Sequence, residues 1–166
     1  ILYNNVGGST LNDGPVTTVS NDEFWLKMKV DLFGIWLGCR HVIPHMIKTG
    51  GGSIINASSI TALIGTKNKD AYTCAKGAII ALTRSMAVEF AEHRIRVSAV
   101  APAGTLTERV AARMDNSKRT SLKASDHLLG LSDPLDVAQA VLYLASDESR
   151  TTTGHVLRVD SGVSIS

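Results

Sequence analysis

Apolar residues recur every three or four positions over one long stretch near the start of the chain, which is the spacing of one helix face. Ser20 and Glu23 precede this stretch with the spacing of a capping box, so we predict a helix over about 21–48. Its inner face should carry Phe24, Met28, Leu32, Ile35, Cys39, Val42 and Met46. Pro44 should kink or shorten the last turns because it removes a backbone donor, and the glycine run that starts at Gly50 should end the helix.

Shorter apolar runs of strand length alternate with further helical stretches along the rest of the chain. The strand candidates are residues 1–3, 53–57, 95–100 and 155–159, and a second helix is predicted over about 70–92. A third helix should begin at Pro134 and bury Leu135, Ala138, Val141, Leu142 and Ala145. Between them, residues 103–132 are polar and weakly patterned, and should form a mobile or partly helical excursion. This alternation predicts an α/β fold with a parallel sheet covered by helices.

The composition narrows the class of protein. With 166 residues, 44% hydrophobic and 19% charged, and a formal charge of +2, we expect one soluble globular domain. Basic residues are scattered among acidic ones and only 5% of residues are aromatic, so we predict no nucleic-acid binding. Cys39 and Cys74 lack metal-ligand spacing and are expected to be ordinary buried thiols in a reducing cytoplasm. No membrane-spanning run or signal segment is apparent, so we expect a cytoplasmic protein without a membrane partner.

Turn-forming and hydroxyl residues follow each strand candidate directly. The segments "NNVGG", "ASS", "APAG" and "VDSG" come after the four predicted strands. Because the carboxyl ends of parallel strands lie at one edge of a sheet, where ligands bind in such folds, all four segments should meet there. Each alone has a plainer explanation, since Asn and Gly form turns and Ser caps helices.

The segment "YTCAK" places a phenol and an ammonium on one helix face, because Tyr72 and Lys76 are four residues apart. A nearby cation stabilises a phenolate, so Lys76 should lower the pKa of Tyr72 toward the range useful for general acid–base catalysis. Ser59, directly after a strand, could donate a hydrogen bond to the substrate oxygen on which charge develops. On an ordinary helix the same Tyr and Lys would be a surface pair.

Two weaker patterns are assigned no function. His41 and His45 lie one helical turn apart but lack a third ligand, so we predict no metal site. Residues 108–126 are rich in basic side chains, which would suit an anionic substrate but is more typical of a solvated surface.

Five segments in the same order resemble the classical short-chain dehydrogenase/reductases over essentially the whole chain. They are "YNNVGG", "GGSIINASS", "YTCAK", "RVSAVAPAGTLT" and "TGHVLRVDSG". The resemblance implies a Rossmann-like, doubly wound parallel sheet, an NAD or NADP cofactor, and hydride transfer between a small-molecule alcohol and a carbonyl. It also implies a homo-oligomer, a dimer or a homotetramer, paired through the helices at 21–48 and 70–92.

The resemblance also implies roles for individual residues. Tyr72 would be the general acid/base, Lys76 would bind the nicotinamide ribose, and Ser59 would orient the substrate oxygen. Asn5 and Gly7 would lie along the cofactor. The excursion over 103–132 would cover the substrate, and within it Thr105 and Thr107 would approach the nicotinamide amide and the phosphates.

The chain departs from the family pattern at several positions. Asp31 stands where the family usually carries a catalytic Asn that holds a proton-relay water partly through its main chain, and it is expected to take that place. As a plain helix residue it would instead be exposed or paired. Ala103, Ser98 and Ser161 also replace residues that are common in the family.

The glycine-rich phosphate-binding turn of such folds is absent from these 166 residues. We therefore expect residues 1–166 to be one partial domain, the catalytic half of a dehydrogenase, and inactive alone. The alternative is a catalytically inactive truncated homologue that serves as a binding or oligomer-assembly module. Retention of Ser59, Tyr72 and Lys76 favours the enzyme, because an assembly module has no evident need for this set.

Overall fold

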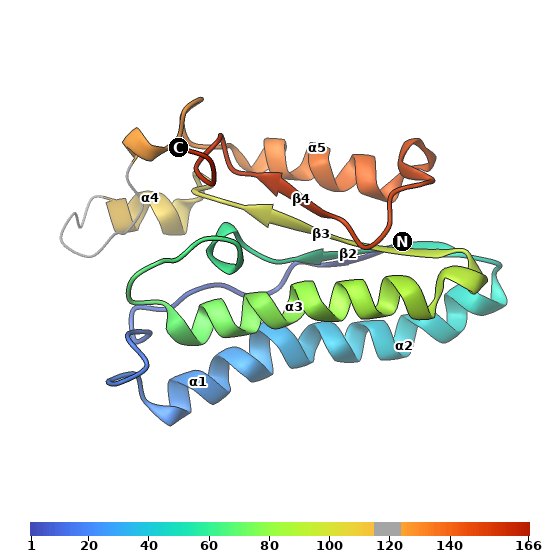
Figure 1. Ribbon diagram of the computed structural model, residues 1–166, viewed down its shortest axis with the longest axis horizontal. Helices are drawn as coiled ribbons and strands as arrows, with labels where there is room; N and C mark the ends of the chain where they lie inside the picture. Colours follow the sequence, from blue (N-terminus) through green and yellow to red (C-terminus); the bar gives the residue numbers. More distant parts are fainter. Residues whose placement is uncertain (115–123) are drawn as a thin grey trace.

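Four parallel strands form one sheet in the order β1-β2-β3-β4 in the computed structural model, which describes residues 1–114 and 124–166. The strands are β1 (Leu2–Asn4), β2 (Gly52–Ala57), β3 (Ile95–Pro102) and β4 (Val156–Val159). The central strands β2 and β3 are buried along nearly their whole length, as expected when helices cover both faces. The predicted α/β fold with a parallel sheet is confirmed (Figure 1).

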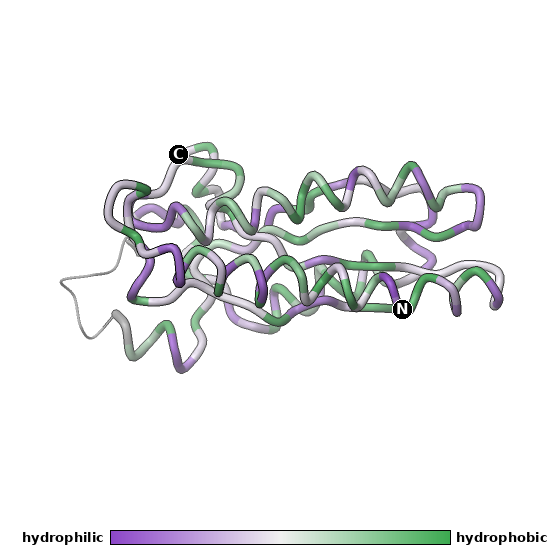
Figure 2. The backbone as a smooth tube through the Cα atoms, turned by 90° about the horizontal axis from the view of Figure 1, so that it is seen from below, coloured by the Kyte–Doolittle hydropathy of each residue, from purple (hydrophilic) through white to green (hydrophobic). Residues whose placement is uncertain are grey.

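One face of the sheet is covered by the long helical segment and by α3 (Asp70–Glu89), which is followed by the short helix η3 (Ala91–His93) (Figure 1). Side chains of α2 (Gly34–Lys48) and α3 pack there against Ile54 of β2 and Val97 of β3. The buried residues that α2 and α3 contribute are Ile35, Cys39, Ile43, Met46, Ile79, Met86 and Ala87. Hydrophobic and hydrophilic positions alternate along these helices, as amphipathic packing requires (Figure 2).

The helical segment at 21–48 has the predicted ends but contains a local irregularity. It consists of α1 (Asn21–Lys27), the π-helical turn η1 (Met28–Phe33) and α2 (Gly34–Lys48). Pro44 lies inside α2, which continues to Lys48, so of the two expected effects shortening of the helix does not occur. Ser20 accepts a hydrogen bond from the Glu23 amide as predicted, but the Glu23 carboxylate bonds Thr10 instead of completing the capping box.

The other face of the sheet is covered by α5 (Pro134–Ala145). This helix buries Leu144 fully and packs Ala140, Val141 and Ala145 against the sheet. The predicted inner face was wrong at Leu135 and Leu142, which are 66% and 61% exposed, and at Ala138, which is also exposed. Apolar residues occur on more than one side of α5, so their spacing did not define a single face. The short helix η5 (Asp147–Ser149) follows.

The predicted excursion contains α4 (Glu108–Met114) and the short helix η4 (Ala124–Asp126), and its residues 115–123 lie outside the described part. Cys39 is buried, as expected, and burial raises the pKa of its thiol to about 11. Cys74 is exposed, so the expectation of two buried thiols was wrong for this residue. In the described part of the chain, no helix has the length and apolar character needed to cross a membrane.

Candidate active site

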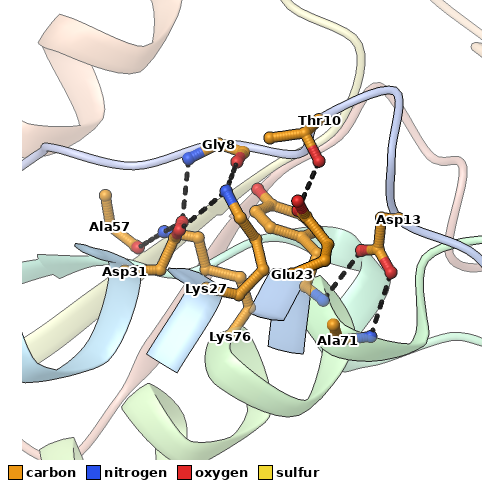
Figure 3. Close-up of polar contacts among 10 residues, drawn as sticks. Gly8, Thr10, Asp13, Glu23, Lys27, Asp31, Ala57, Ala71 and Lys76 are labelled. Carbon is orange, nitrogen blue, oxygen red and sulfur yellow. Dashed lines mark hydrogen bonds and ion pairs between the residues drawn. The ribbon is translucent and has the colours of Figure 1, made fainter. Parts of the chain in front are cut away.

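The first turns of α3 lie at the carboxyl edge of the sheet and carry Tyr72 and Lys76. Asp13, in the loop after β1, caps this helix by accepting hydrogen bonds from the amides of Ala71 and Tyr72 at 3.2 and 2.9 Å (Figure 3). A carboxylate at a helix N-terminus satisfies free backbone donors and is favoured by the helix dipole. The loop after β1 therefore fixes where α3 begins, and with it the position of Tyr72.

Lys76 is almost completely buried, with only 2% of the residue exposed. Its ammonium donates a hydrogen bond to the Ala57 carbonyl at 2.8 Å, pairs with Asp31 at 3.3 Å, and lies 5.6 Å from the centre of the Tyr72 ring. The hydroxyl of Ser58, directly after β2, donates to the Lys76 carbonyl at 2.9 Å. Sheet and helix are thus joined at the residue that faces the phenol.

Asp31 lies in the π-helical turn and its side chain is fully buried. Its Oδ1 accepts a hydrogen bond from the Gly8 amide at 2.8 Å, and its Oδ2 lies 3.4 Å from the ammonium of Lys27. As a plain helix residue, Asp31 was expected to be either exposed or paired. The structure shows that it is buried and paired. A π-helical turn shifts the register of the residues that follow, and such turns are frequent at functional sites.

The pKa of Tyr72 is raised above its ordinary value, so the expected net lowering is wrong for this structure. Burial of the phenol is the largest cause, and the nearby Asp31 carboxylate also raises the pKa. A hydrogen bond from Ser59 and the charge of Arg109 act in the opposite direction. The pKa of Lys76 is lowered, chiefly by burial, while Asp31 raises it and Lys27 lowers it.

Ser59 is buried at the end of β2, where its Oγ accepts a weak hydrogen bond from the Thr61 amide at 3.3 Å as the N-cap of η2 (Ile60–Ala62). The same hydroxyl reaches the Tyr72 phenol. The structure therefore brings Ser59, Tyr72, Lys76 and Asp31 together, as the sequence predicted. The capping role weighed as an alternative for Ser59 coexists with its contact to Tyr72.

The residues expected to line the cofactor differ in how close they lie to Tyr72, Lys76 and Asp31. Gly7 lies against the cluster, since a methyl group on it would come within 2.3 Å of Asp31 Oδ1 and 3.1 Å of Lys76 Nζ. Asn5 is exposed and accepts a hydrogen bond from Tyr3 at 2.9 Å. Thr105 is half-buried and Thr107 caps α4; in the described residues neither forms a hydrogen bond with the Tyr72 and Lys76 side chains.

Sequence reasoning missed three contributors to the site. Lys27 lies one turn before Asp31 and is buried beside it. Gly8 is close to Arg109 of α4, because a methyl group on Gly8 would lie 2.3 Å from Arg109 Nη2. The spacing of Lys27 and Asp31 was the available signal, since oppositely charged residues four apart on a helix pair readily.

The donor set suits a nucleoside cofactor. A buried ammonium, a phenol and a serine hydroxyl converge where parallel strands end, and these groups complement ribose hydroxyls and a polarised carbonyl. Within the described residues, no group of three or more His, Cys, Asp and Glu side chains has the geometry to hold a metal ion.

The chain is similar to known dehydrogenases and reductases over nearly its whole length. A family model described as enoyl-(acyl carrier protein) reductase matches residues 1–164. The 7alpha-hydroxysteroid dehydrogenase of Clostridium sardiniense is 37% identical over 166 residues, covering 99% of this chain and 63% of that protein. The 3-oxoacyl-[acyl-carrier-protein] reductase FabG of Chlamydia pneumoniae is 39% identical over 163 residues, covering 98% and 64%.

Solved structures show the same fold. ElxO with NADP bound superimposes with a TM-score of 0.89 at 35% identity, covering 98% of this chain and 66% of that one. The aldohexose dehydrogenase of Thermoplasma acidophilum also gives 0.89, at 36% identity and with 99% and 68% coverage. The chain thus spans a little under two thirds of the length of the first curated relatives that it matches.

Proposed function

Since the chain belongs to the classical short-chain dehydrogenase/reductase family, we propose that its protein is an NAD(P)-dependent oxidoreductase that interconverts an alcohol and a carbonyl by hydride transfer. The observation that carries this proposal is the meeting of Ser59, Tyr72 and Lys76 at the carboxyl edge of the sheet. An assembly module, the alternative from the sequence, would not need an ammonium buried beside a half-buried phenol.

In the proposed reduction, Tyr72 donates its phenolic proton to the carbonyl oxygen, which becomes the alcohol hydroxyl. Ser59 donates a hydrogen bond to the same oxygen and stabilises the charge that develops there. The positive charge of Lys76 stabilises the phenolate that remains. The hydride for the carbonyl carbon would come from NADH or NADPH, which Lys76 and Tyr72 would hold by its nicotinamide ribose. In alcohol oxidation each group acts in reverse, with Tyr72 as the base.

Several residues would hold the cofactor under this proposal. Lys76 and Tyr72 would bind the nicotinamide ribose, and Asn5 and Gly7 would line its path. Thr105 and Thr107 would approach the nicotinamide amide and the phosphates. The excursion over 103–132 would cover a small-molecule substrate. The cytoplasmic location expected from the sequence stays a prediction.

Replacement of Ser59 by Ala tests this proposal directly. We expect kcat for carbonyl reduction to fall by about 10²- to 10³-fold, as when one donor to a developing oxyanion is removed. The measurement is the rate of NADPH or NADH oxidation by the natural protein at its full length, with a panel of ketones as substrates. An active wild type whose Ser59→Ala variant keeps full activity would contradict the assigned role.

Ser53→Ala is a matched control for this experiment. Ser53 is also buried in β2, but its hydroxyl donates to the Leu144 carbonyl of α5 at 2.8 Å, on the face away from α3. Its loss should cost about 1 kcal/mol of stability and leave kcat unchanged. Equal losses of kcat in both variants would show that damage to β2, not loss of a catalytic hydroxyl, explains the result.

We also propose that the protein is a homo-oligomer, paired through the helical segment 21–48 and α3. Trp25, Phe33 and Trp36 on this segment are 58%, 53% and 49% exposed, and they line an open apolar groove of about 520 Å³ with Leu82 of α3. Exposed apolar patches of this kind mark association surfaces.

Trp36→Glu should therefore shift the protein from a dimer or tetramer toward a smaller species, because it places a charge in the apolar contact. Light scattering coupled to size-exclusion chromatography measures the mass. Leu129→Glu is the control, since Leu129 is 88% exposed but lies outside this helical face. An unchanged mass for Trp36→Glu would place the contact elsewhere.

A further inference from the structure

The backbone N–H and C=O of Gly8 are both hydrogen-bonded to the members of one buried ion pair. The Gly8 amide donates to Asp31 at 2.8 Å, and the Gly8 carbonyl accepts a hydrogen bond from Lys27 at 2.7 Å (Figure 3). Lys27 and Asp31 lie 3.4 Å apart, and their side chains are only 4% and 0% exposed. Together they fix the loop after β1 against the helical segment, beside Lys76.

Lys27, Asp31 and Lys76 form a buried charge cluster. Its two cations and one anion give it a net charge of +1. Asp31 lies between the two ammonium groups, 3.4 Å from Lys27 and 3.3 Å from Lys76. If Lys27 were uncharged, Asp31 would compensate Lys76 alone, and the cluster would be neutral. Charges interact strongly in a buried site. A change in the net charge of the cluster should therefore shift the titration of the Tyr72 phenol, whose ring lies 5.6 Å from the Lys76 ammonium.

Among the described residues, Lys27 and Lys76 are the cations that pair with Asp31, and the nearby carboxylates have other partners. Glu23, one turn earlier, is engaged by Thr10, and Asp13 accepts from the backbone of α3. Arg109 of α4 lies close to Gly8 but is exposed. Among the described residues, Oδ2 has no hydrogen-bond partner of its own and depends on the ion pair.

We infer that Lys27 is a positioning residue for the proposed reaction, on which this inference rests: it shares the charge of Asp31 with Lys76 and holds Gly8, so that Asp31 only partly compensates the positive charge that Lys76 presents to Tyr72. Without this partner, an aspartate at position 31 would work against the phenolate that the reaction needs. The Asp31 carboxylate does raise the pKa of Tyr72. Lys27 and Asp31 therefore form a unit that is neutral as a whole and rigid in its contacts.

Three variants separate charge from packing: Lys27→Gln, Asp31→Asn and the double variant. Gln keeps a donor for the Gly8 carbonyl but removes the charge, so the cluster becomes neutral and the Tyr72 phenol should titrate at higher pH. Asp31→Asn leaves two cations, so the phenol should titrate at lower pH. The double variant restores the net charge of +1, and its titration should return to that of the wild type.

Ultraviolet difference spectra of the phenolate measure this titration in the natural protein at its full length. A matched Tyr72→Phe background isolates the signal of Tyr72 from that of the other tyrosines, which within residues 1–166 are Tyr3 and Tyr143. As a second readout, alcohol oxidation at neutral pH should fall roughly three- to tenfold in Lys27→Gln, as expected for loss of one nearby charge, and recover in the double variant.

Coincident Tyr72 titrations in Lys27→Gln and the wild type would overturn the inference. Shifts in the same direction for both single variants would also overturn it, because damage to packing does not depend on the sign of the charge removed. If Lys27→Gln does not fold, the comparison uses Lys27→Arg, which keeps the charge, with the double variant; both must then titrate as the wild type does. The titration needs no turnover, so an inactive wild type with opposite shifts would refute the proposed reaction and still support the role of Lys27.

Discussion

Replacement of Tyr72 by Phe is expected to lower the rate of carbonyl reduction by about 10²- to 10⁴-fold, the usual contribution of a positioned general acid. The phenol is the proton donor in the proposed reaction, and its oxygen meets Ser59 at the edge of the sheet. The ring itself remains in Phe, so the cation of Lys76 keeps an aromatic neighbour at 5.6 Å. Folding should be intact, and single-turnover rates with NADPH or NADH measure the effect.

Tyr143→Phe is the matched control for this experiment. Tyr143 lies on α5, where its hydroxyl is 3.3 Å from Thr152, and it is remote in the chain from the Tyr72 and Lys76 pair. It should keep its full rate. Unchanged turnover in Tyr72→Phe would show that another group moves the proton, and the cluster would then have to be assigned a binding role.

The parallel direction of the strands could be predicted because strands alternate with helices along the chain, and because β2 and β3 are covered on both faces and have nearly continuous apolar sequences. The ends of the helical segment could be predicted from Ser20 and the glycine run. The π-helical turn at Met28–Phe33 could not, because the apolar spacing continues through it without a break. A single extra residue in a turn leaves almost no trace in a periodic pattern.

The meeting of Ser59, Tyr72 and Lys76 could be predicted from topology, because parallel strands end at one edge. The part played by Lys27 could not, since its burial depends on a loop that folds back to place Gly8 above it. Periodicity assigns only apolar residues to the inside. The direction of the Tyr72 pKa shift was missed for a related reason: it depends mainly on how deeply the phenol is buried.

Replacement of Lys76 by Met should separate activity from stability. Turnover should fall by about 10²-fold or more, because the cation that stabilises the phenolate is lost together with a proposed ligand of the ribose. Stability at neutral pH should be maintained or rise, because Asp31 keeps Lys27 as its partner at 3.4 Å and a buried cation is removed. Such a trade is typical of residues that are retained for function at a cost in stability.

The pH dependence of unfolding gives this prediction its sign. Burial lowers the pKa of Lys76 below its ordinary value of 10.5, so the unfolded chain binds more protons than the folded one between the two values. The contribution of Lys76 therefore makes the folded protein more stable as the pH rises through that alkaline window. Lys76→Met should remove this rise from denaturation curves measured at a series of pH values. A loss of about 3–5 kcal/mol at neutral pH, as expected when a buried ion pair is broken, would instead mean that Asp31 depends on Lys76 and that Lys27 does not suffice to neutralise it.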